Sequence, residues 1–161
     1  GKNQAMKVAR VTLSDRASSG VYEDRSGPEI ERVWTTLGGA EAEWIRVLIP
    51  DDFETIVSTL RQLCDEDSCD LIITTGGTGP APRDVTPEAT RAVIQRELPG
   101  FGEIMRVRSF EFVKTAILSR STAGTRGRAL IVNMPGNPKA IGECLPLVYP
   151  AILEALKHLR E

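Results

Sequence analysis

The sequence predicts an α/β fold, a three-layer sandwich with a mostly parallel central sheet. Segments typical of strands and of helices alternate along the chain, as they do in parallel sheets covered by helices on both faces. Two short aliphatic runs, at 70–75 and 129–136, are typical of strands buried on both faces. The length of 161 residues suits one domain, which we expect to span residues 6–161.

The first half of the chain predicts two strands and two helices. A β-branched run at 6–14 indicates a strand. A helix then begins near Pro28, and the glycine pair at 38–39 ends it. The alternating segment 41–50 predicts the second strand, and apolar residues at helical spacing over 53–64 predict the second helix.

The second half contains one clear helix start. Thr86, Pro87 and Glu88 combine a capping hydroxyl, a proline in the first turn and an acid near the positive end of the helix dipole. The elements expected after the strand at 70–75 are a helix at 86–97, a helix at 101–110, a strand or loop near 115–118, a strand at 129–136 and a helical region from Asn137 that Pro146 and Pro150 kink or split in two.

The composition argues against several classes of protein. The net charge of −2 is unlike that of a general nucleic-acid binder, and the aliphatic runs are too short to span a membrane. The three cysteines and one histidine lack the spacing of a zinc site, so we expect His158 to be a surface or packing residue. Reduced thiols and no signal peptide suggest the cytoplasm, and residues 1–5 are typical of an expression remnant.

The segment TTGGTGPAPRDVTP, residues 74–87, is the strongest local signal of a ligand site. Its glycines can adopt positive φ and carry no side chain, so successive backbone N–H groups can converge on an anion. The residues that would form this site are Thr75, Gly76, Gly77, Thr78, Gly79 and Arg83. The segment matches neither GxxxxGK[ST] nor GxGxxG, so a phosphate site and a plain chain-reversing turn both stay open.

Two aspartates are expected at the same carboxyl edge of the sheet. Asp51 follows the second predicted strand, and Asp84 ends the glycine-rich segment. Two carboxylates at one edge could hold Mg²⁺, which prefers oxygen ligands and bridges phosphates. Asp51 could equally cap the helix that follows it, and Asp84 could be a turn residue paired with Arg83.

Two further loops are expected at this edge. The loop 133–139 offers the amides of Asn133 and Asn137, close approach at Gly136 and a helix N-terminus, although its spacing alone favours a plain turn. A polar loop at 14–20 follows the first strand. Three such loops together predict a site for a large phosphorylated ligand.

Six segments then point to a known family: SDRASSGVYEDRSGP, IPDD, TTGGTGPAPRDVTPEAT, ELPGFGE, AILSRSTAG and NMPGNPKAIGECL. Their order resembles that in the molybdopterin adenylyltransferases, which include Mog-type and MoaB-type proteins and domains of proteins such as gephyrin. The resemblance covers nearly the whole chain. It implies a three-layer α/β fold and adenylylation of molybdopterin by ATP and Mg²⁺, with release of pyrophosphate. It also implies a homotrimer or hexamer, and a molybdenum insertase as the downstream partner.

The resemblance also implies a role for each site residue. Asp51 and Asp84 match the two essential acidic positions of the family and are assigned to Mg²⁺ and catalysis. The other assignments are Thr75, Gly76, Gly77, Thr78 and Gly79 to the nucleotide phosphates, Ser14, Asp15, Asn133, Met134, Pro135 and Gly136 to the adenosine end, and Ser119 and Arg120 to the molybdopterin phosphate.

Two other functions stay open at this point. The short end after His158 and the segment PGNPKAIGECL also suit MoaB-type proteins, some of which bind the cofactor precursor without strong transferase activity. A binding or carrier protein is therefore the main alternative to an enzyme, and a scaffold subunit is the third. The presence of both Asp51 and Asp84 favours the enzyme.

Overall fold

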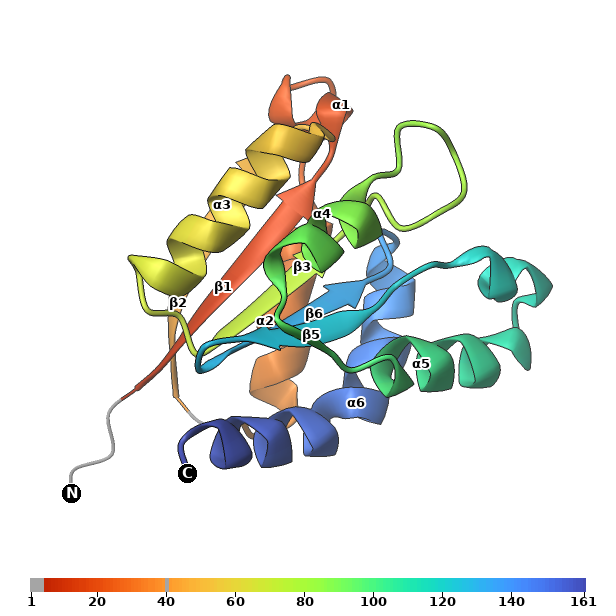
Figure 1. Cartoon of the computed structure of the whole chain (residues 1–161). Helices are drawn as coiled ribbons and strands as arrows, with labels where there is room; N and C mark the ends of the chain where they lie inside the picture. The colour runs from red at the N-terminus through yellow and green to blue at the C-terminus, as the bar shows by residue number, and fades with distance from the viewer. Residues whose placement is uncertain (1–4, 40) are drawn as a thin grey trace.

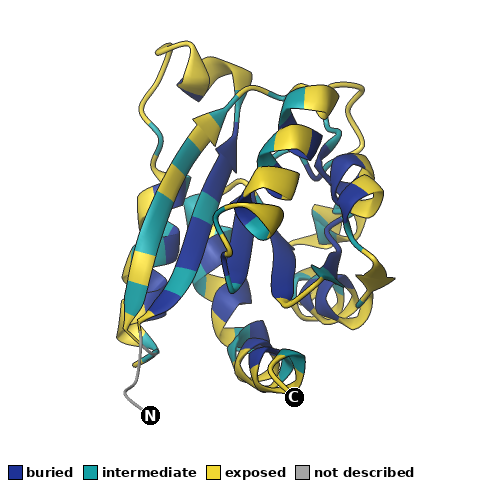
Figure 2. Cartoon of the chain, turned by 60° about the vertical axis from the view of Figure 1, so that its left-hand side comes forward, coloured by how far each residue is buried: buried dark blue, intermediate teal, exposed yellow. Residues whose placement is uncertain are grey.

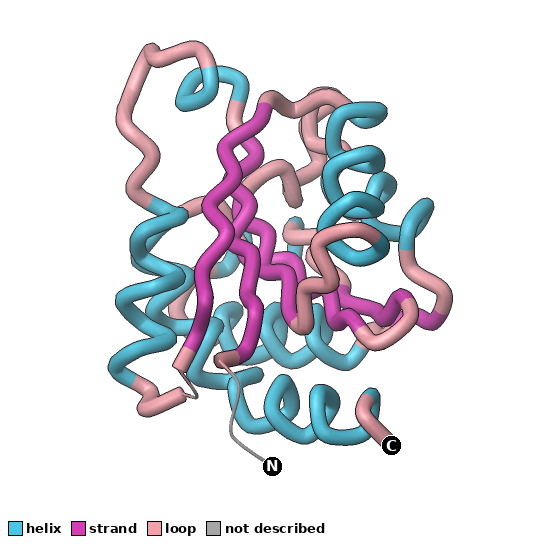
Figure 3. Tube along the Cα trace, turned by 90° about the vertical axis from the view of Figure 1, so that its left-hand side faces the viewer, coloured by secondary structure: helices cyan, strands magenta, loops and turns pink. Residues whose placement is uncertain are grey.

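The central feature of the computed structural model is a six-stranded sheet that lies between two layers of helices (Figures 1 and 3). The structure describes residues 5–39 and 41–161, so residues 1–4 of the expected expression remnant lie outside it. In chain order the elements are β1 (Met6–Leu13), α1 (Asp15–Ser18), α2 (Ser26–Thr36), β2 (Ala42–Ile49), α3 (Phe53–Asp65), β3 (Leu71–Thr75), α4 (Thr86–Val93), β4 (Arg96–Glu97), α5 (Gly100–Phe110), the 3₁₀ helix η1 (Lys114–Leu118), β5 (Ala123–Arg126), β6 (Ala129–Met134) and α6 (Pro138–Leu159).

The strand order of the sheet is β2-β1-β3-β6-β5-β4. The strands β2, β1, β3 and β6 pair in parallel, and β5 pairs antiparallel with both β6 and β4. The prediction of a mostly parallel sheet in an α/β sandwich is therefore confirmed. Because the four parallel strands point the same way, the loops that follow them all lie at one edge, at the top of Figure 1.

Each face of the sheet carries its own apolar core. The helices α2, α5 and α6 cover one face, where Ile30, Trp34 and Leu145 are almost completely buried. The helices α3 and α4 cover the other face through Leu60 and Val93. Figure 2 shows the central strands buried between these layers, whereas the edge strand β2 is only partly covered. The two aliphatic runs at 70–75 and 129–136 contain the buried strands β3 and β6, which end at Thr75 and Met134.

The helix expected over 86–97 is shorter than predicted. The helix α4 ends at Val93, and Arg96–Glu97 forms the edge strand β4. The backbone N–H of Gln95 donates to the carbonyl of Thr125 at 2.7 Å. A longer helix would need this N–H for its own hydrogen bonds, but here it pairs with β5. The sequence prediction also omitted β5 and α1, and η1 occupies the segment for which a strand or loop was expected.

The prolines of the last helix do not split it, but the helix bends along its length in Figure 1, which is the other of the two predicted outcomes. The helix α6 is continuous from Pro138 to Leu159 and includes Pro146 and Pro150. Each proline removes one backbone donor, but the helix buries a long apolar stripe that includes Ile141 and Ile152. Burial of this stripe outweighs the lost hydrogen bonds. Among the described residues, no helix is both long enough and apolar enough to cross a membrane.

Candidate active site

A cavity of about 410 Å³ opens at the carboxyl edge of the sheet, where the chain leaves β1 and β3. The connection after β1 leads to α2 on one face, and the connection after β3 leads to α4 on the other face. Open α/β sheets bind ligands at such a switch point. The cavity is lined by Thr12, Leu13, Ser14, Asp15, Arg16, Ala17, Tyr22, Asp24, Arg25, Ser26, Asp51, Thr75, Gly76, Gly77, Arg83 and Gly136.

The glycines of the β3–α4 loop are required by its geometry. Gly76 and Gly77 have φ values of +98° and +66°. A Cβ on Gly76 would lie 2.5 Å from the carbonyl oxygen of Leu13, and one on Gly77 would lie 2.3 Å from Oγ1 of Thr86. Thr86 holds the turn, because its hydroxyl donates to the carbonyl of Gly76 and its N–H donates to that of Gly77.

The same loop presents free backbone donors. Within residues 5–39 and 41–161, the N–H groups of Gly77, Thr78 and Gly79 have no hydrogen-bond acceptor. Consecutive free N–H groups in a glycine-rich turn can bind an anion without any charged side chain. The predicted close approach of backbone to a ligand has a geometric basis at Gly76 and Gly77, which line the cavity, whereas Thr78 and Gly79 lie outside its lining.

Asp15 and Asp51, which both line the cavity, form two reciprocal hydrogen bonds. The N–H of Asp51 donates to Oδ1 of Asp15 at 2.8 Å, and the N–H of Asp15 donates to Oδ2 of Asp51 at 3.2 Å. These two bonds join the start of α1 to the loop after β2. Asp51 does not cap α3, since that role belongs to Asp52, whose carboxylate accepts from the N–H of Thr55.

The second carboxylate oxygen of Asp51 has no partner. Among the described residues, Oδ1 of Asp51 is the one buried side-chain oxygen or nitrogen without a hydrogen bond. Burial raises the pKa of Asp51, and the nearby charges of Asp15 and Asp84 raise the pKa further, against the bond from Asp15 and the charge of Arg83. A buried, unpaired carboxylate oxygen among like charges is a favourable position for a cation.

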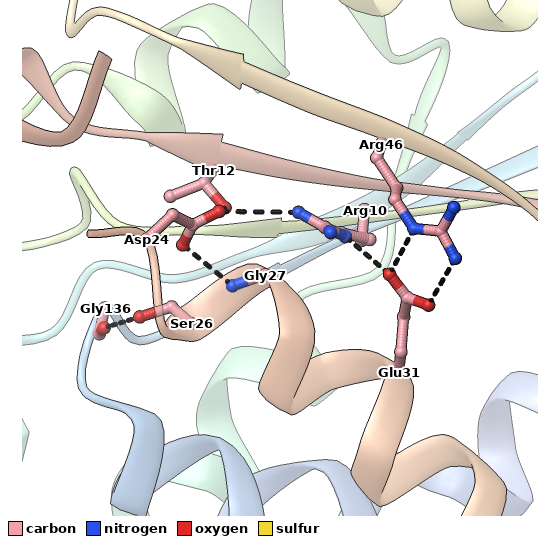
Figure 4. A network of polar contacts seen from close by, with 8 residues as sticks. All are labelled: Arg10, Thr12, Asp24, Ser26, Gly27, Glu31, Arg46 and Gly136. Carbon is pink, nitrogen blue, oxygen red and sulfur yellow. Dashed lines mark hydrogen bonds and ion pairs between the residues drawn. The ribbon is translucent and has the colours of Figure 1, made fainter. Parts of the chain in front are cut away.

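Asp24, another residue of the cavity lining, belongs to a polar network whose side chains pair with one another (Figure 4). The carboxylate of Asp24 accepts from the hydroxyl of Thr12 at 2.9 Å, from Nη1 of Arg10 at 3.4 Å and from the N–H of Gly27 at 3.0 Å. Arg10 also donates to Glu31. The network ties the loop before α2 to β1 and so fixes one wall of the cavity.

Arg16, Tyr22, Arg25 and Ser26 also lie in this wall. The hydroxyl of Ser26 donates to the carbonyl of Gly136 at 2.6 Å, which joins this loop to the loop after β6. Tyr22, Arg25 and Ser26 could not be assigned a role from the sequence, because they belong to a polar stretch without periodicity. Its only usable signal was the density of serine and charge directly after a strand.

Eight of the predicted site residues line the cavity, and the others lie outside its lining. The eight are Ser14, Asp15, Asp51, Thr75, Gly76, Gly77, Arg83 and Gly136. Asp84 is outside the lining, and its Oδ2 accepts from the N–H of Ala81 at 3.1 Å. The side chain of Asn133 is completely buried and bonds Thr74 and Thr90, and Met134 is completely buried in the core. The side chains of Asn133 and Met134 therefore pack inside the chain and do not line the cavity.

Ser119 and Arg120 lie on a different side of the glycine-rich loop. Ser119 and Pro135 line a second cavity of about 220 Å³, between α5, η1 and the start of α6. The guanidinium of Arg120 is directed to the glycine-rich loop, where it bonds the carbonyls of Gly79 and Asp84. The β6–α6 loop contributes to both cavities, Gly136 to the first and Pro135 to the second.

The described residues contain no cluster of three histidine, cysteine or acidic side chains suited to a metal ion. Cys64, Cys69 and Cys144 are free thiols, and burial raises the pKa of each. His158 is exposed on α6 beside Glu154, in agreement with the prediction of a surface residue. The site therefore contains backbone amides, arginines and aspartates, which suit the transfer of charged phosphate groups rather than attack by a thiol or imidazole.

A comparison with protein-family models matches residues 9–155 to a family described as the probable molybdopterin binding domain. The chain belongs to this family. The molybdopterin adenylyltransferase of Escherichia coli K12 is 54% identical over 153 residues, which cover 95% of this chain and 78% of that protein. The one from Helicobacter pylori J99 is 51% identical over 149 residues, which cover 92% and 85%.

Solved structures of the family have the same fold. The molybdopterin biosynthesis enzyme MoaB from Thermus thermophilus superposes with a TM-score of 0.87 at 41% identity, over 96% of both chains. The resemblance that the six sequence segments indicated is therefore confirmed at the level of the family and of the fold. The identity to relatives named adenylyltransferase is higher than the identity to this MoaB protein.

Proposed function

We propose that this chain is a molybdopterin adenylyltransferase. One structural observation carries the proposal: the unpaired carboxylate oxygen of Asp51 lies in the same cavity wall as the positive-φ glycines Gly76 and Gly77. A position for a cation next to free backbone donors suits a nucleotide polyphosphate, which carries its own divalent cation. The similarity to named adenylyltransferases supplies the second substrate.

The reaction transfers AMP from ATP to molybdopterin. The terminal phosphate oxygen of molybdopterin forms a new bond to the α-phosphorus of ATP, and the bond from that phosphorus to the bridging oxygen of the β-phosphate breaks. The bonding electrons leave with pyrophosphate. No covalent bond to the protein is needed, so the protein contributes by positioning the two anions and neutralising their charge.

In this proposal, different groups of the chain bind the phosphate oxygens and balance their negative charge. The free N–H groups of Gly77, Thr78 and Gly79 bind the phosphate oxygens, and Arg16, Arg25 and Arg83 supply positive charge around the cavity. The paired Asp15 and Asp51 connect the start of α1 to this phosphate site.

Asp51 and Asp84 are the proposed holders of Mg²⁺. The donor set fits a hard cation, since Oδ1 of Asp51 is buried without a partner and Asp84 is close enough to raise the pKa of Asp51. When bound, Mg²⁺ neutralises charge on the polyphosphate. The remaining ligands of the ion would be phosphate oxygens and water, because the described chain supplies no third acidic, histidine or cysteine ligand at one point.

Molybdopterin is assigned to the second cavity. That cavity has a mainly apolar wall, formed by residues such as Met105 and Val113, and a polar rim that includes Ser119. A flat heterocycle with a phosphate tail needs both kinds of surface. The β6–α6 loop contributes Pro135 to this cavity and Gly136 to the first one, so a phosphate that reaches past this loop would approach the nucleotide.

We also propose that the protein assembles as a homotrimer, with a hexamer as the alternative. The support is a group of exposed apolar side chains on α5, η1 and the turn between them: Ile104, Val107, Phe110, Phe112, Val113, Ile117 and Leu118. A patch of this kind usually marks an interface. The molecular mass in solution, measured by light scattering, would test this assembly, and a monomer would contradict it.

The proposed setting is the cytoplasm, and a molybdenum insertase is the proposed acceptor of the product. The three free thiols support a reducing compartment. These two proposals are independent of the chemistry of the site and do not affect its test.

The direct test is to mix the purified protein with molybdopterin, ATP and Mg²⁺. We expect release of pyrophosphate together with adenylylated pterin, identified by mass spectrometry, and neither product when Mg²⁺ is omitted. Binding of molybdopterin without pyrophosphate release would contradict the enzyme and favour a carrier of the MoaB type.

A further inference from the structure

Arg120 binds the glycine-rich loop through both its side chain and its backbone. A ligand of the molybdopterin phosphate would not require these hydrogen bonds. Its Nε donates to the carbonyl of Gly79 at 2.9 Å, and its Nη2 donates to the carbonyl of Asp84 at 2.7 Å. Its backbone N–H donates to the carbonyl of Thr78 at 2.8 Å. One residue thus binds three carbonyls, at both ends of the segment 78–84.

The third edge of the guanidinium is also occupied. Nη1 of Arg120 forms an ion pair with Glu88, on the first turn of α4. Because a guanidinium is planar and its donors are fixed relative to one another, this pair orients the two groups that bind the loop. The interaction lowers the pKa of Glu88, so the carboxylate stays ionised as its partner.

Few other hydrogen bonds hold the segment 78–84. Asp84 accepts from the N–H of Ala81 and donates its own N–H to the carbonyl of Ala81. These bonds close the turn on itself but do not attach it to the sheet. Arg120 supplies that attachment from the far side, next to β5. The position of the Asp84 carboxylate relative to Asp51 therefore depends on Arg120.

We infer that Arg120 is a positioning residue that places Asp84 and the free N–H groups of the glycine-rich loop, rather than a ligand of the molybdopterin phosphate. The part of this inference that concerns Mg²⁺ and turnover rests on the proposed function. The part that concerns the loop does not. Groups that orient a metal ligand without contacting the metal typically change metal affinity or activity when they are lost.

The test compares Arg120→Lys, Arg120→Ala and Glu88→Gln with Arg128→Ala as the matched control. Arg128 is exposed and has no hydrogen bond or ion pair within the described residues. Lysine keeps the charge of Arg120 but not its planar set of donors. If Arg120 positions the loop, lysine at this position will not restore the position of the loop. If Arg120 only supplies positive charge to a phosphate, lysine will retain much of the function.

The first measurement is hydrogen exchange of the loop, without any substrate. The amide protons of Ala81 and Asp84 should exchange about tenfold faster in both Arg120 variants than in wild type, with a smaller change in Glu88→Gln and none in Arg128→Ala. Unchanged exchange in both Arg120 variants would overturn the inference. Glu88→Gln keeps the test available if the Arg120 variants fail to fold.

The second measurement separates the two roles by kinetics. The Mg²⁺ concentration that gives half-maximal velocity should rise about tenfold in Arg120→Lys, with little change in the KM for molybdopterin. A higher KM for molybdopterin in Arg120→Ala, with wild-type Mg²⁺ dependence and recovery in Arg120→Lys, would overturn the inference in favour of a phosphate ligand. A wild-type chain without turnover would refute the proposed function, and the exchange measurement would still decide the role of Arg120.

Discussion

Two carboxylates that line one cavity show how the same charge can serve structure or function. Asp24 accepts hydrogen bonds from Thr12, Arg10 and Gly27, so its charge is compensated by the protein. Asp51 is bonded through one oxygen to Asp15, and its other oxygen is buried without a partner. A carboxylate whose hydrogen-bond partners all come from the chain, as in Asp24, indicates a structural role. A buried carboxylate oxygen without a partner, as in Asp51, costs free energy and indicates that a ligand supplies the missing partner.

The largest expected effect is the loss of activity when either proposed Mg²⁺ ligand, Asp51 or Asp84, loses its charge. Asp51→Ala and Asp84→Asn should each lower kcat by at least about 100-fold, because stabilisation by the metal is worth several kcal/mol and each ~1.4 kcal/mol is tenfold in rate. Binding of molybdopterin should remain, which fluorescence titration can measure. Asp52→Asn is the control, since asparagine also caps helices and Asp52 lies outside the cavity lining. Full activity in either of the first two variants would remove the metal assignment.

The second effect concerns the compensated carboxylate. Asp24→Ala should lower the free energy of unfolding by about 2–3 kcal/mol, because it leaves a largely buried Arg10 with Glu31 as its remaining partner. Urea denaturation measures this change. Arg32→Ala, which breaks an exposed pair with Glu29, should cost less than about 1 kcal/mol. Equal costs for the two variants would mean that the Asp24 network is an ordinary surface feature.

The sequence predicted the paired strands better than it predicted the paired charges. Strands β3 and β6 are continuous aliphatic runs, so their burial is visible in the sequence itself. The strands β4 and β5 have two and four residues, and they exist because their backbones meet at the sheet edge. Gly124 allows that contact, since a Cβ there would lie 2.6 Å from the carbonyl of Arg96. No local pattern encodes such a contact.

In the site, too, some features follow from local sequence and others depend on contacts between distant segments. Gly76, Gly77 and Asp51 were predictable because loops after parallel strands must share an edge. The bonds from Arg10 to Asp24 and from Arg120 to Asp84 join separate segments, and no spacing rule relates them. The resemblance to the family assigned Arg120 to a phosphate by position alone, whereas its hydrogen bonds connect it to the loop.

The third prediction tests how closely the glycine-rich loop approaches Asp51. Gly77 and Gly127 have similar φ values, +66° and +56°, so alanine at either position costs about 1–2 kcal/mol of backbone strain. A Cβ on Gly77 would also approach Thr86 at 2.3 Å and Asp51 at 3.1 Å, whereas one on Gly127 has nothing within 4 Å. We expect Gly77→Ala to be the less stable variant by about 1 kcal/mol or more in urea denaturation. Equal stability would show that the loop relaxes freely away from Asp51.

The smallest effect is the pH dependence of stability, and here Asp51 and the carboxylate of Glu31, in the network of Asp24, should respond with opposite signs. Burial and the charges of Asp15 and Asp84 raise the pKa of Asp51 in the folded chain. The folded state therefore holds this proton at pH values where the unfolded chain has lost it, and wild type loses stability as pH rises through that range. Asp51→Asn removes this loss, so its stability relative to wild type should increase from acidic to neutral pH.

Glu31, in the compensated network, should behave in the opposite way. Hydrogen bonds from Arg46 and then Arg10 lower the pKa of Glu31 against the effect of burial. Its stabilisation is complete above the ordinary carboxyl pKa and is lost as pH falls through the lowered value. The cost of Glu31→Gln should therefore be greatest near neutral pH and should shrink on acidification. Urea denaturation of both variants across this range, without Mg²⁺, measures the two slopes. If Asp51→Asn followed the slope of Glu31→Gln, Asp51 would be a compensated structural carboxylate, and the physical argument for a cation at this site would fail.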